Sequence, residues 1–305
     1  MPSSDRTPRT GRSALAAACS LAALAAALAG CATPAAQPPA PWPAQIATLL
    51  PTDILLIGEQ HDAPAHQQLQ REAVQWLAAR QQLAALVMEM AEAGHSTQGL
   101  PRDASEAQVQ QAVGWQDRAW PWAHYGPVAM AAVQAGVPVL GGNLPRAQMR
   151  EALRDERLDG HLPPQALQQQ YQALRDGHCG LLPESQIPGM ARIQIARDAS
   201  MARVAAAARA PGRVVVLVAG GGHVLRHQGV PTHWPAGLTS KVALAQSGSA
   251  QTAINSEADL ILLTPALPPQ DPCADLRRGL AGSGGAPAAT TPAAPAAAPA
   301  PAAGR

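Results

Sequence analysis

A short apolar run that ends in a glycine, and is followed at once by a carboxylate and an imidazole, constrains this chain more than any other feature. Residues 53–57 read Asp-Ile-Leu-Leu-Ile, and a glycine, Glu59, a glutamine and His61 follow. The run has the length and composition of a buried strand, and open α/β sheets bind ligands at the carboxyl ends of their strands. Pro64 suits a first helical turn, so we expect a helix to begin there with His66 in its first turn.

The same pattern recurs three times along the chain. Apolar runs at 83–88, 137–140 and 213–219 also end beside chemically useful side chains, which are Glu89, Asn143 and His223. In a parallel sheet these ends lie on one edge, so residues that are distant in the sequence meet in one crevice. Any one of them is also compatible with a turn residue or a surface histidine, but the fourfold recurrence favours a shared site.

Segments typical of strands and of helices alternate through the chain. Helices are expected at 64–80, 104–112, 124–135, 145–157, 163–175 and 189–209, and late strands at 240–246 and 260–264. Alternation of this kind implies parallel crossover connections. The sequence therefore predicts an α/β fold with a mostly parallel central sheet flanked by helices, and with inserted helices covering the carboxyl edge of the strands.

The helix expected at 189–209 carries an apolar stripe with an arginine in its middle. The stripe consists of Met190, Ile193, Arg197, Met201 and Val204. Leaving a buried charge without its partner costs about 3–5 kcal/mol. Either Arg197 pairs with Glu59 or Glu89, or its side chain extends to the rim of the fold.

Taken as an ordered set, several short motifs over about residues 50–265 resemble the ChaN-like lipoproteins of the Tiki/erythromycin-esterase superfamily. The motifs are the G-E-x-H start, Val87-Met-Glu-Met90, Trp122-Ala-His-Tyr-Gly-Pro127, Gly142-Asn-Leu-Pro-Arg146, Ala196-Arg-Asp198 and Gly-Gly-Gly-His223. The resemblance implies an α/β fold and, for ChaN itself, haem binding in iron acquisition, with paired haems held at a dimer interface. Relatives in the superfamily include hydrolases, so the fold alone does not settle the activity.

Haem requires an axial ligand, an apolar slot and cations for its propionates. The chain has no phenylalanine and only two tyrosines, and Tyr125 follows three tryptophans and His124. We therefore predict Tyr125 as the ligand of the haem iron, since a phenolate binds iron in some haem proteins. His124 points roughly 100° away on a helix, so the two are not expected to bind one iron. Alternatively, these aromatic residues form a core cluster over the sheet.

Five further residues are expected at the haem site: His124, His61, His66, Arg197 and Asn143. The same crevice also suits a metal-dependent hydrolase, protease-like or esterase-like, as an alternative function. Glu59 would then act as general base, and Glu89 and the histidines, His61 and His223 among them, would donate a proton or bind a divalent metal ion. The chain lacks a G-x-S-x-G nucleophile motif.

The first 31 residues read as a lipoprotein signal. Three arginines precede the apolar segment 14–30, which ends in Leu-Ala-Gly before Cys31. We expect a signal peptide at 1–30 and acylation of Cys31. Ala32, rather than an aspartate, favours the outer membrane, with the protein facing the periplasm. A Pro/Ala-rich tether at 31–44, an α/β domain at 45–278 and a disordered Ala/Pro tail at 279–305 are expected to follow.

Charge and cysteine content fit an exported protein that does not bind nucleic acid. Removing the signal peptide takes away three arginines and Asp5 and changes the net charge from +1 to about −1. Once Cys31 is acylated, Cys179 and Cys273 are the two cysteines left in the mature chain. In an oxidising compartment we expect them to form a disulfide. The alternative is that Cys179, beside a histidine, is a thiolate ligand.

Overall fold

The computed structural model describes residues 41–251, 254, 256–269, 271, 273–274 and 277–278. The expected signal peptide at 1–30, most of the tether at 31–44 and the tail at 279–305 lie outside these residues. Within the described ranges, no helix combines the length and the apolar character that crossing a membrane requires.

Six strands form one parallel sheet in the order β3-β2-β4-β1-β5-β6. The strands are β1 (Ile54–Glu59), β2 (Leu83–Glu92), β3 (Val139–Asn143), β4 (Val214–Gly220), β5 (Ser240–Ser247) and β6 (Leu260–Thr264). Each expected strand is present, and the predicted α/β fold with a parallel central sheet is confirmed. β2 is longer than its apolar run because it continues past Met88 to Glu92 through an irregularity in its register with β3.

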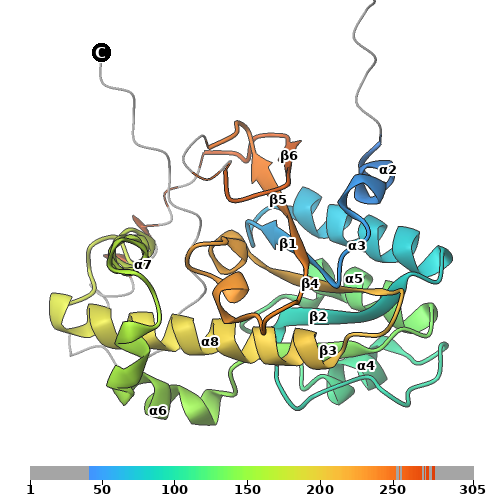
Figure 1. The fold of residues 1–305 in the computed structure, drawn as a ribbon, viewed down its shortest axis with the longest axis horizontal. Coiled ribbons are helices and arrows are strands. Elements are labelled where there is room, and N and C mark those ends of the chain that lie inside the picture. The colour runs from blue at the N-terminus through green and yellow to red at the C-terminus, as the bar shows by residue number, and fades with distance from the viewer. Residues whose placement is uncertain are drawn as a thin grey trace, which may run out of the picture. The chain divides into compact units, whose positions relative to one another are not determined.

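Helices cover both faces of the sheet. The α-helices are α2 (Trp42–Gln45), α3 (Pro64–Ala79), α4 (Glu106–Ala112), α5 (Trp122–Gln134), α6 (Met149–Arg154), α7 (Pro164–Gly177) and α8 (Ile187–Ala207). The 3-10 turns are η1 (Ile46–Leu49), η2 (Arg146–Gln148), η3 (Glu156–Gly160), η4 (Glu184–Gln186), η5 (Gly221–Val224) and η6 (Val230–His233). In Figure 1, α8 crosses one face of the sheet, and α3 and α5 lie on the other.

The helix expected at 145–157 is divided into η2, α6 and η3. Asp155 interrupts it, because this residue leaves the helical conformation and its side chain accepts a hydrogen bond from the backbone N–H of Arg157 at 3.2 Å. Short polar side chains commonly compete with helical hydrogen bonds in this way.

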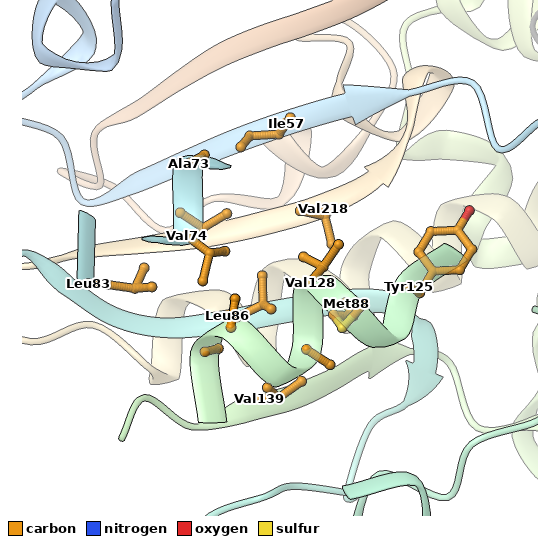
Figure 2. Close-up of a cluster of buried hydrophobic side chains, with 14 of the residues drawn as sticks. Ile57, Ala73, Val74, Leu83, Leu86, Met88, Tyr125, Val128, Val139 and Val218 are labelled. Atoms are coloured by element: carbon orange, nitrogen blue, oxygen red, sulfur yellow. The ribbon is translucent and has the colours of Figure 1, made fainter. Parts of the chain in front are cut away.

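Two apolar cores lie on opposite faces of the sheet. Side chains alternate along a strand, so Leu55 and Ile57 join the core beneath α3 and α5, whereas Leu56 joins the core beneath α8. Figure 2 shows the first core, in which Val74 of α3 and Val128 of α5 pack over the strands. Burial on both faces explains why the strands read as continuous apolar runs.

The strand order brings the polar strand ends together. β4 lies between β1 and β2, although it follows them by more than a hundred residues in the chain. Glu59, at the end of β1, is in register with Gly220 of β4. On the other side of β4, Met88 is in register with Val218. The carboxyl ends of the three strands therefore place Glu59, Glu89 and the glycine run before His223 side by side.

Candidate functional site

The carboxylate of Glu59 is buried and fully hydrogen-bonded. Its Oε1 accepts a bond from the hydroxyl of Tyr125 at 2.6 Å and lies 2.7 Å from Nδ1 of His61. Its Oε2 accepts bonds from the Nε2 atoms of Gln67 and Gln70, each at 2.7 Å. Sequence reasoning missed these two glutamines, although their three-residue spacing on α3 places them on one face. A carboxylate with both oxygens engaged in this way orients the groups around it.

The second strand-end carboxylate, Glu89, forms a buried ion pair with Arg197 of α8. Nη2 of Arg197 donates to Oε1 of Glu89 at 2.5 Å, and the backbone N–H of Gly220 donates to Oε2 at 2.7 Å. Arg197 also donates to Oδ1 of Asn143 at 2.9 Å and to Oε1 of Gln194 at 3.2 Å. Arg197 is 4% exposed, so its side chain forms the buried ion pair with Glu89 and does not extend to the rim of the fold.

His223, which follows the glycine run, joins Glu89 to a third carboxylate. Its Nδ1 lies 2.6 Å from Oδ1 of Asp198 and its Nε2 lies 3.3 Å from Oε1 of Glu89. Burial opposes a charged ring, but the charges of Glu89 and Asp198 outweigh it and raise the pKa of His223 to about 9. Asp198 lies beside Arg197 in the Ala-Arg-Asp motif, yet sequence reasoning gave it no role.

Burial affects the two carboxyl groups of this network differently. It raises the pKa of Asp198, although the charge of His223 acts in the opposite direction. For Glu89, burial is outweighed by the charges of His223 and Arg197, which hold the pKa of the carboxyl well below its usual range. Glu89 is therefore an anion held between two cations.

His61 lies between the two strand-end carboxylates. Its Nδ1 faces Glu59, whereas its Nε2 is 3.9 Å from Oε2 of Glu89 and has no hydrogen-bond partner among the described residues. The ring packs edge-on against Trp120, with centroids 4.8 Å apart. Gly220 permits this packing, since a Cβ there would lie 2.7 Å from Nε2. Burial opposes protonation of the ring, but the bond to Glu59 and the charge of Glu89 outweigh it and raise the pKa of His61.

Two other histidines that were predicted at the haem site, His66 and His124, do not line the strand-end cavity described below. His66 is buried, and its Nδ1 accepts a bond from the backbone N–H of Gln60 at 2.9 Å while its Nε2 lies 2.9 Å from Oγ1 of Thr264. Both nitrogens are thus occupied, and burial lowers the pKa of the ring. His66 joins the ends of β1 and β6 and has no free nitrogen for iron. His124 is exposed on α5 and is not part of the strand-end network.

Tyr125 is part of the core and of the Glu59 network. It is 1% exposed, and the rings of Trp115 and Trp120 lie 6.1 and 5.9 Å from its ring. Burial and the negative charge of Glu59 raise the pKa of its phenol, which disfavours the phenolate that iron would bind. The geometry favours the aromatic core cluster and does not favour Tyr125 as an iron ligand.

A cavity of about 210 Å³ opens at the carboxyl ends of β1, β4 and β5, with α7 and α8 also contributing to its wall. Its ionisable lining residues are Glu59, His61, Asp198 and His223. Four buried glutamines also line it, namely Gln170, Gln194, Gln228 and Gln246. This cavity is the observed form of the predicted crevice, with α7 as the inserted helix over the strand ends.

A larger hollow, of about 560 Å³, lies beside β2, β3 and α8 and is bordered by Leu100, Val137 and Val204. None of the described residues that line it is a histidine, cysteine, methionine or tyrosine, so it offers no axial ligand of the usual kinds for haem iron. The strand-end cavity contains two imidazoles. It is therefore the better candidate for a site that binds haem.

The two remaining cysteines are joined. Cys179, in the loop after α7, and Cys273, beyond β6, form a disulfide across a sequence separation of 94 residues. The expected disulfide is thus present, and Cys179 is not a free thiolate in the structure. The bond ties the segment that follows the last strand to the helical insertion.

Comparison with known proteins shows a family and a similar fold. A family model described as haem-binding uptake, Tiki superfamily, ChaN matches residues 45–233. The fold is similar to a solved structure described as cofacial heme binding to ChaN of Campylobacter jejuni, with a TM-score of 0.58 and 20% sequence identity over 72% of this chain and 89% of that one. No curated protein matches the sequence. The family match spans more than half of the chain, and the chain therefore belongs to the ChaN family of haem-binding uptake proteins in the Tiki superfamily.

Proposed function

We propose that this protein binds haem in haem uptake, with the macrocycle at the mouth of the strand-end cavity. The observation that carries the proposal is the family match over residues 45–233, because that range contains both strand-end carboxylates and every imidazole of the cavity. Haem supplies an iron that accepts an axial ligand and a flat apolar ring.

Of the two imidazoles in the cavity wall, His61 has a ring nitrogen without a partner among the described residues, whereas both nitrogens of His223 face carboxylates. The unpartnered atom of His61 is its buried Nε2, and its Nδ1 faces the carboxylate of Glu59. Histidines that bind metals commonly donate their other ring N–H to a carboxylate, which fixes the ring and makes the free nitrogen a better ligand. Imidazole is a common axial ligand of haem. We therefore propose that His61, and not Tyr125, would bind the haem iron.

The small size of the cavity supports a homodimer when haem is bound. At about 210 Å³ the cavity is smaller than the roughly 300–1,000 Å³ that usually encloses a ligand of drug size. Much of the haem would therefore project from one copy. We propose that a second copy covers this exposed part in a homodimer.

The location of the protein is also a proposal. The lipobox that ends at Cys31 supports acylation of that cysteine and anchoring in the outer membrane, with the domain in the periplasm. The Cys179–Cys273 disulfide supports an oxidising compartment.

We do not propose the metal-dependent hydrolase. Within the part of the chain that the structure describes, no three histidine, cysteine, aspartate or glutamate side chains are arranged to hold a metal ion. Both oxygens of Glu59 accept hydrogen bonds from protein groups, so this carboxylate is not placed to take a proton from water.

Titration of the purified protein with ferric haem, followed by absorption spectroscopy, tests the haem proposal. We expect a saturable spectrum typical of imidazole ligation at micromolar concentration. His61→Ala should abolish that spectrum, whereas Tyr125→Phe and the exposed control His95→Ala should retain it. Light scattering with and without haem would measure dimer formation. Absence of saturable binding would refute the function, and a phenolate-to-iron band lost in Tyr125→Phe would refute the choice of ligand.

A further inference from the structure

Two glutamine side chains in the wall of the strand-end cavity have hydrogen-bonding groups that nothing in the described part of the chain satisfies. Gln194 of α8 is 3% exposed and Gln246 of β5 is 4% exposed, and both line the cavity. The Nε2 atom of each has no partner. Buried polar groups are nearly always hydrogen-bonded, so these two amides indicate a missing partner.

The unsatisfied atoms are donors, because the other end of each amide is fixed as an acceptor. Oε1 of Gln194 lies 3.2 Å from Nη1 of Arg197, and a guanidinium can only donate. Oε1 of Gln246 lies 2.7 Å from the backbone N–H of Gln251. Reversing either amide would place two donors against each other. The NH₂ group of each glutamine is therefore the end without a partner.

The neighbouring carboxylates, including that of Asp198 in the same wall, do not hydrogen-bond to either Nε2 atom. The oxygens of Glu59 accept from His61, Tyr125 and two glutamines of α3. Those of Glu89 accept from Arg197 and the backbone of Gly220. The two Nε2 atoms therefore lack an acceptor among the described residues, and a partner that satisfies them must bring an oxygen that accepts hydrogen bonds.

The rest of the wall defines what accompanies that oxygen. Leu225, Leu244 and Ile254 form an apolar part of the lining. We propose that the cavity binds a small molecule through a carboxyl-type oxygen, that of a carboxylate or a carboxamide, with the amides of Gln194 and Gln246 as donors and a short aliphatic chain against the apolar wall. A volume of about 210 Å³ accommodates such a molecule.

Ligand-observed NMR titration of the haem-free full-length protein tests this site independently of haem. The probes are butyrate, butyramide and butylammonium, which have the same chain and differ in the polar group. We expect saturable binding of butyrate, butyramide or both, and none of butylammonium, which can only donate. The acid and the amide together decide whether the bound group carries a charge.

Variants tie the binding to the two amides. Gln194→Met and Gln246→Met keep the side-chain length but remove the donor, and each should weaken binding about tenfold. Gln98→Met, at an exposed glutamine outside the cavity, should leave it unchanged. If a methionine variant unfolds in a thermal scan, the side-chain NH₂ signals of Gln194 and Gln246 in the unaltered protein give the answer, since they should shift on saturation.

Two results would overturn the proposal. One is that neither butyrate nor butyramide binds and the NH₂ signals do not move, which would show that water alone satisfies the donors. The other is that butylammonium binds equally well, or that the methionine variants bind like the unaltered protein, which would show that apolar contact alone retains the probes.

Discussion

Replacing Arg197 by methionine should destabilise the protein strongly, because the guanidinium is the hub of the buried polar network. Its side chain is 5% exposed and that of Glu89 is fully buried. Methionine retains the apolar length of arginine but none of its donors. The variant therefore removes the hydrogen bonds that Arg197 donates to the carboxylate of Glu89 and to the side-chain oxygens of Asn143 and Gln194.

The magnitude follows from what remains around Glu89. Breaking a buried ion pair by removing one partner costs about 3–5 kcal/mol. Glu89 would keep the backbone N–H of Gly220 at 2.7 Å and His223 at 3.3 Å, which favours the lower end. The oxygens of Asn143 and Gln194 would lose charge-assisted bonds, which favours a higher value. We expect a loss of about 4 kcal/mol in the free energy of unfolding.

Urea unfolding followed by circular dichroism would measure this loss, with Arg192→Met as the matched control. Arg192 lies five residues earlier on α8 and pairs with Asp159, and the two side chains are 14% and 37% exposed. Asp159 stays in contact with water when its partner is removed, whereas Glu89 does not, so the control should lose less stability than Arg197→Met. Adding Glu89→Gln to Arg197→Met should recover part of the loss, since the two changes act on one pair.

The pH dependence provides a second measure of the same pair. The pKa of Glu89 is lowered from its ordinary value of 4.5 in the folded protein, so its stabilising contribution is present above pH 4.5 and is lost as the pH falls below it. In the Arg197→Met variant the pKa of Glu89 is lowered less, because the guanidinium is missing. The variant and the unaltered protein should therefore become more similar in stability as the pH falls. If Arg197→Met lowers the free energy of unfolding no more than Arg192→Met does at neutral pH, the buried pair does not stabilise the fold.

Three further predictions concern the acylation of Cys31, the disulfide and His233, whose ring stacks on that of His161 with centroids 3.8 Å apart. Cys31→Ser should abolish labelling with a radioactive fatty acid, and undiminished label would refute acylation at this position. Alkylation of the denatured, unreduced protein should leave Cys179 and Cys273 unmodified, and two free thiols would contradict the bond. Burial and the charge of His161 lower the pKa of His233 from 6.5 to about 4, so stability present above pH 6.5 is lost as the pH falls towards 4. His233→Phe should flatten this part of a plot of melting temperature against pH, and an unchanged plot would exclude His233 as its source.

The fold could be predicted from the sequence because its signals are local. Each strand is an apolar run of a few residues, and burial on both faces of a parallel sheet requires such runs. The edge on which ligands bind also follows from the parallel arrangement, so Glu59 and Glu89 could be placed together. That β4 lies between β1 and β2 could not be predicted, because strand order depends on contacts between segments far apart in the chain.

The burial of Tyr125 does not favour it as the predicted iron ligand, and the sequence carries a signal of that burial. Tyr125, Val128 and Ala132 follow each other at spacings of three and four and are all buried on α5. That spacing is the signal of an inward face. Figure 2 shows Tyr125 among the apolar side chains of the α3–α5 core, of which Val128 is also a member. The period of the segment thus indicates a buried Tyr125, whereas its aromatic composition is equally compatible with a flat apolar slot.

The glutamines were missed for a different reason. A neutral amide has no pKa near neutrality and no part in the usual catalytic motifs, so its place in a sequence gives no signal of a role. Yet Gln67 and Gln70 satisfy one oxygen of Glu59, and Gln194 and Gln246 leave two donors without an acceptor in the cavity. The first pair explains why Glu59 holds His61 and does not activate water. The donors of Gln194 and Gln246 are unsatisfied because of how the folded wall is arranged around them. The sequence alone does not indicate that arrangement.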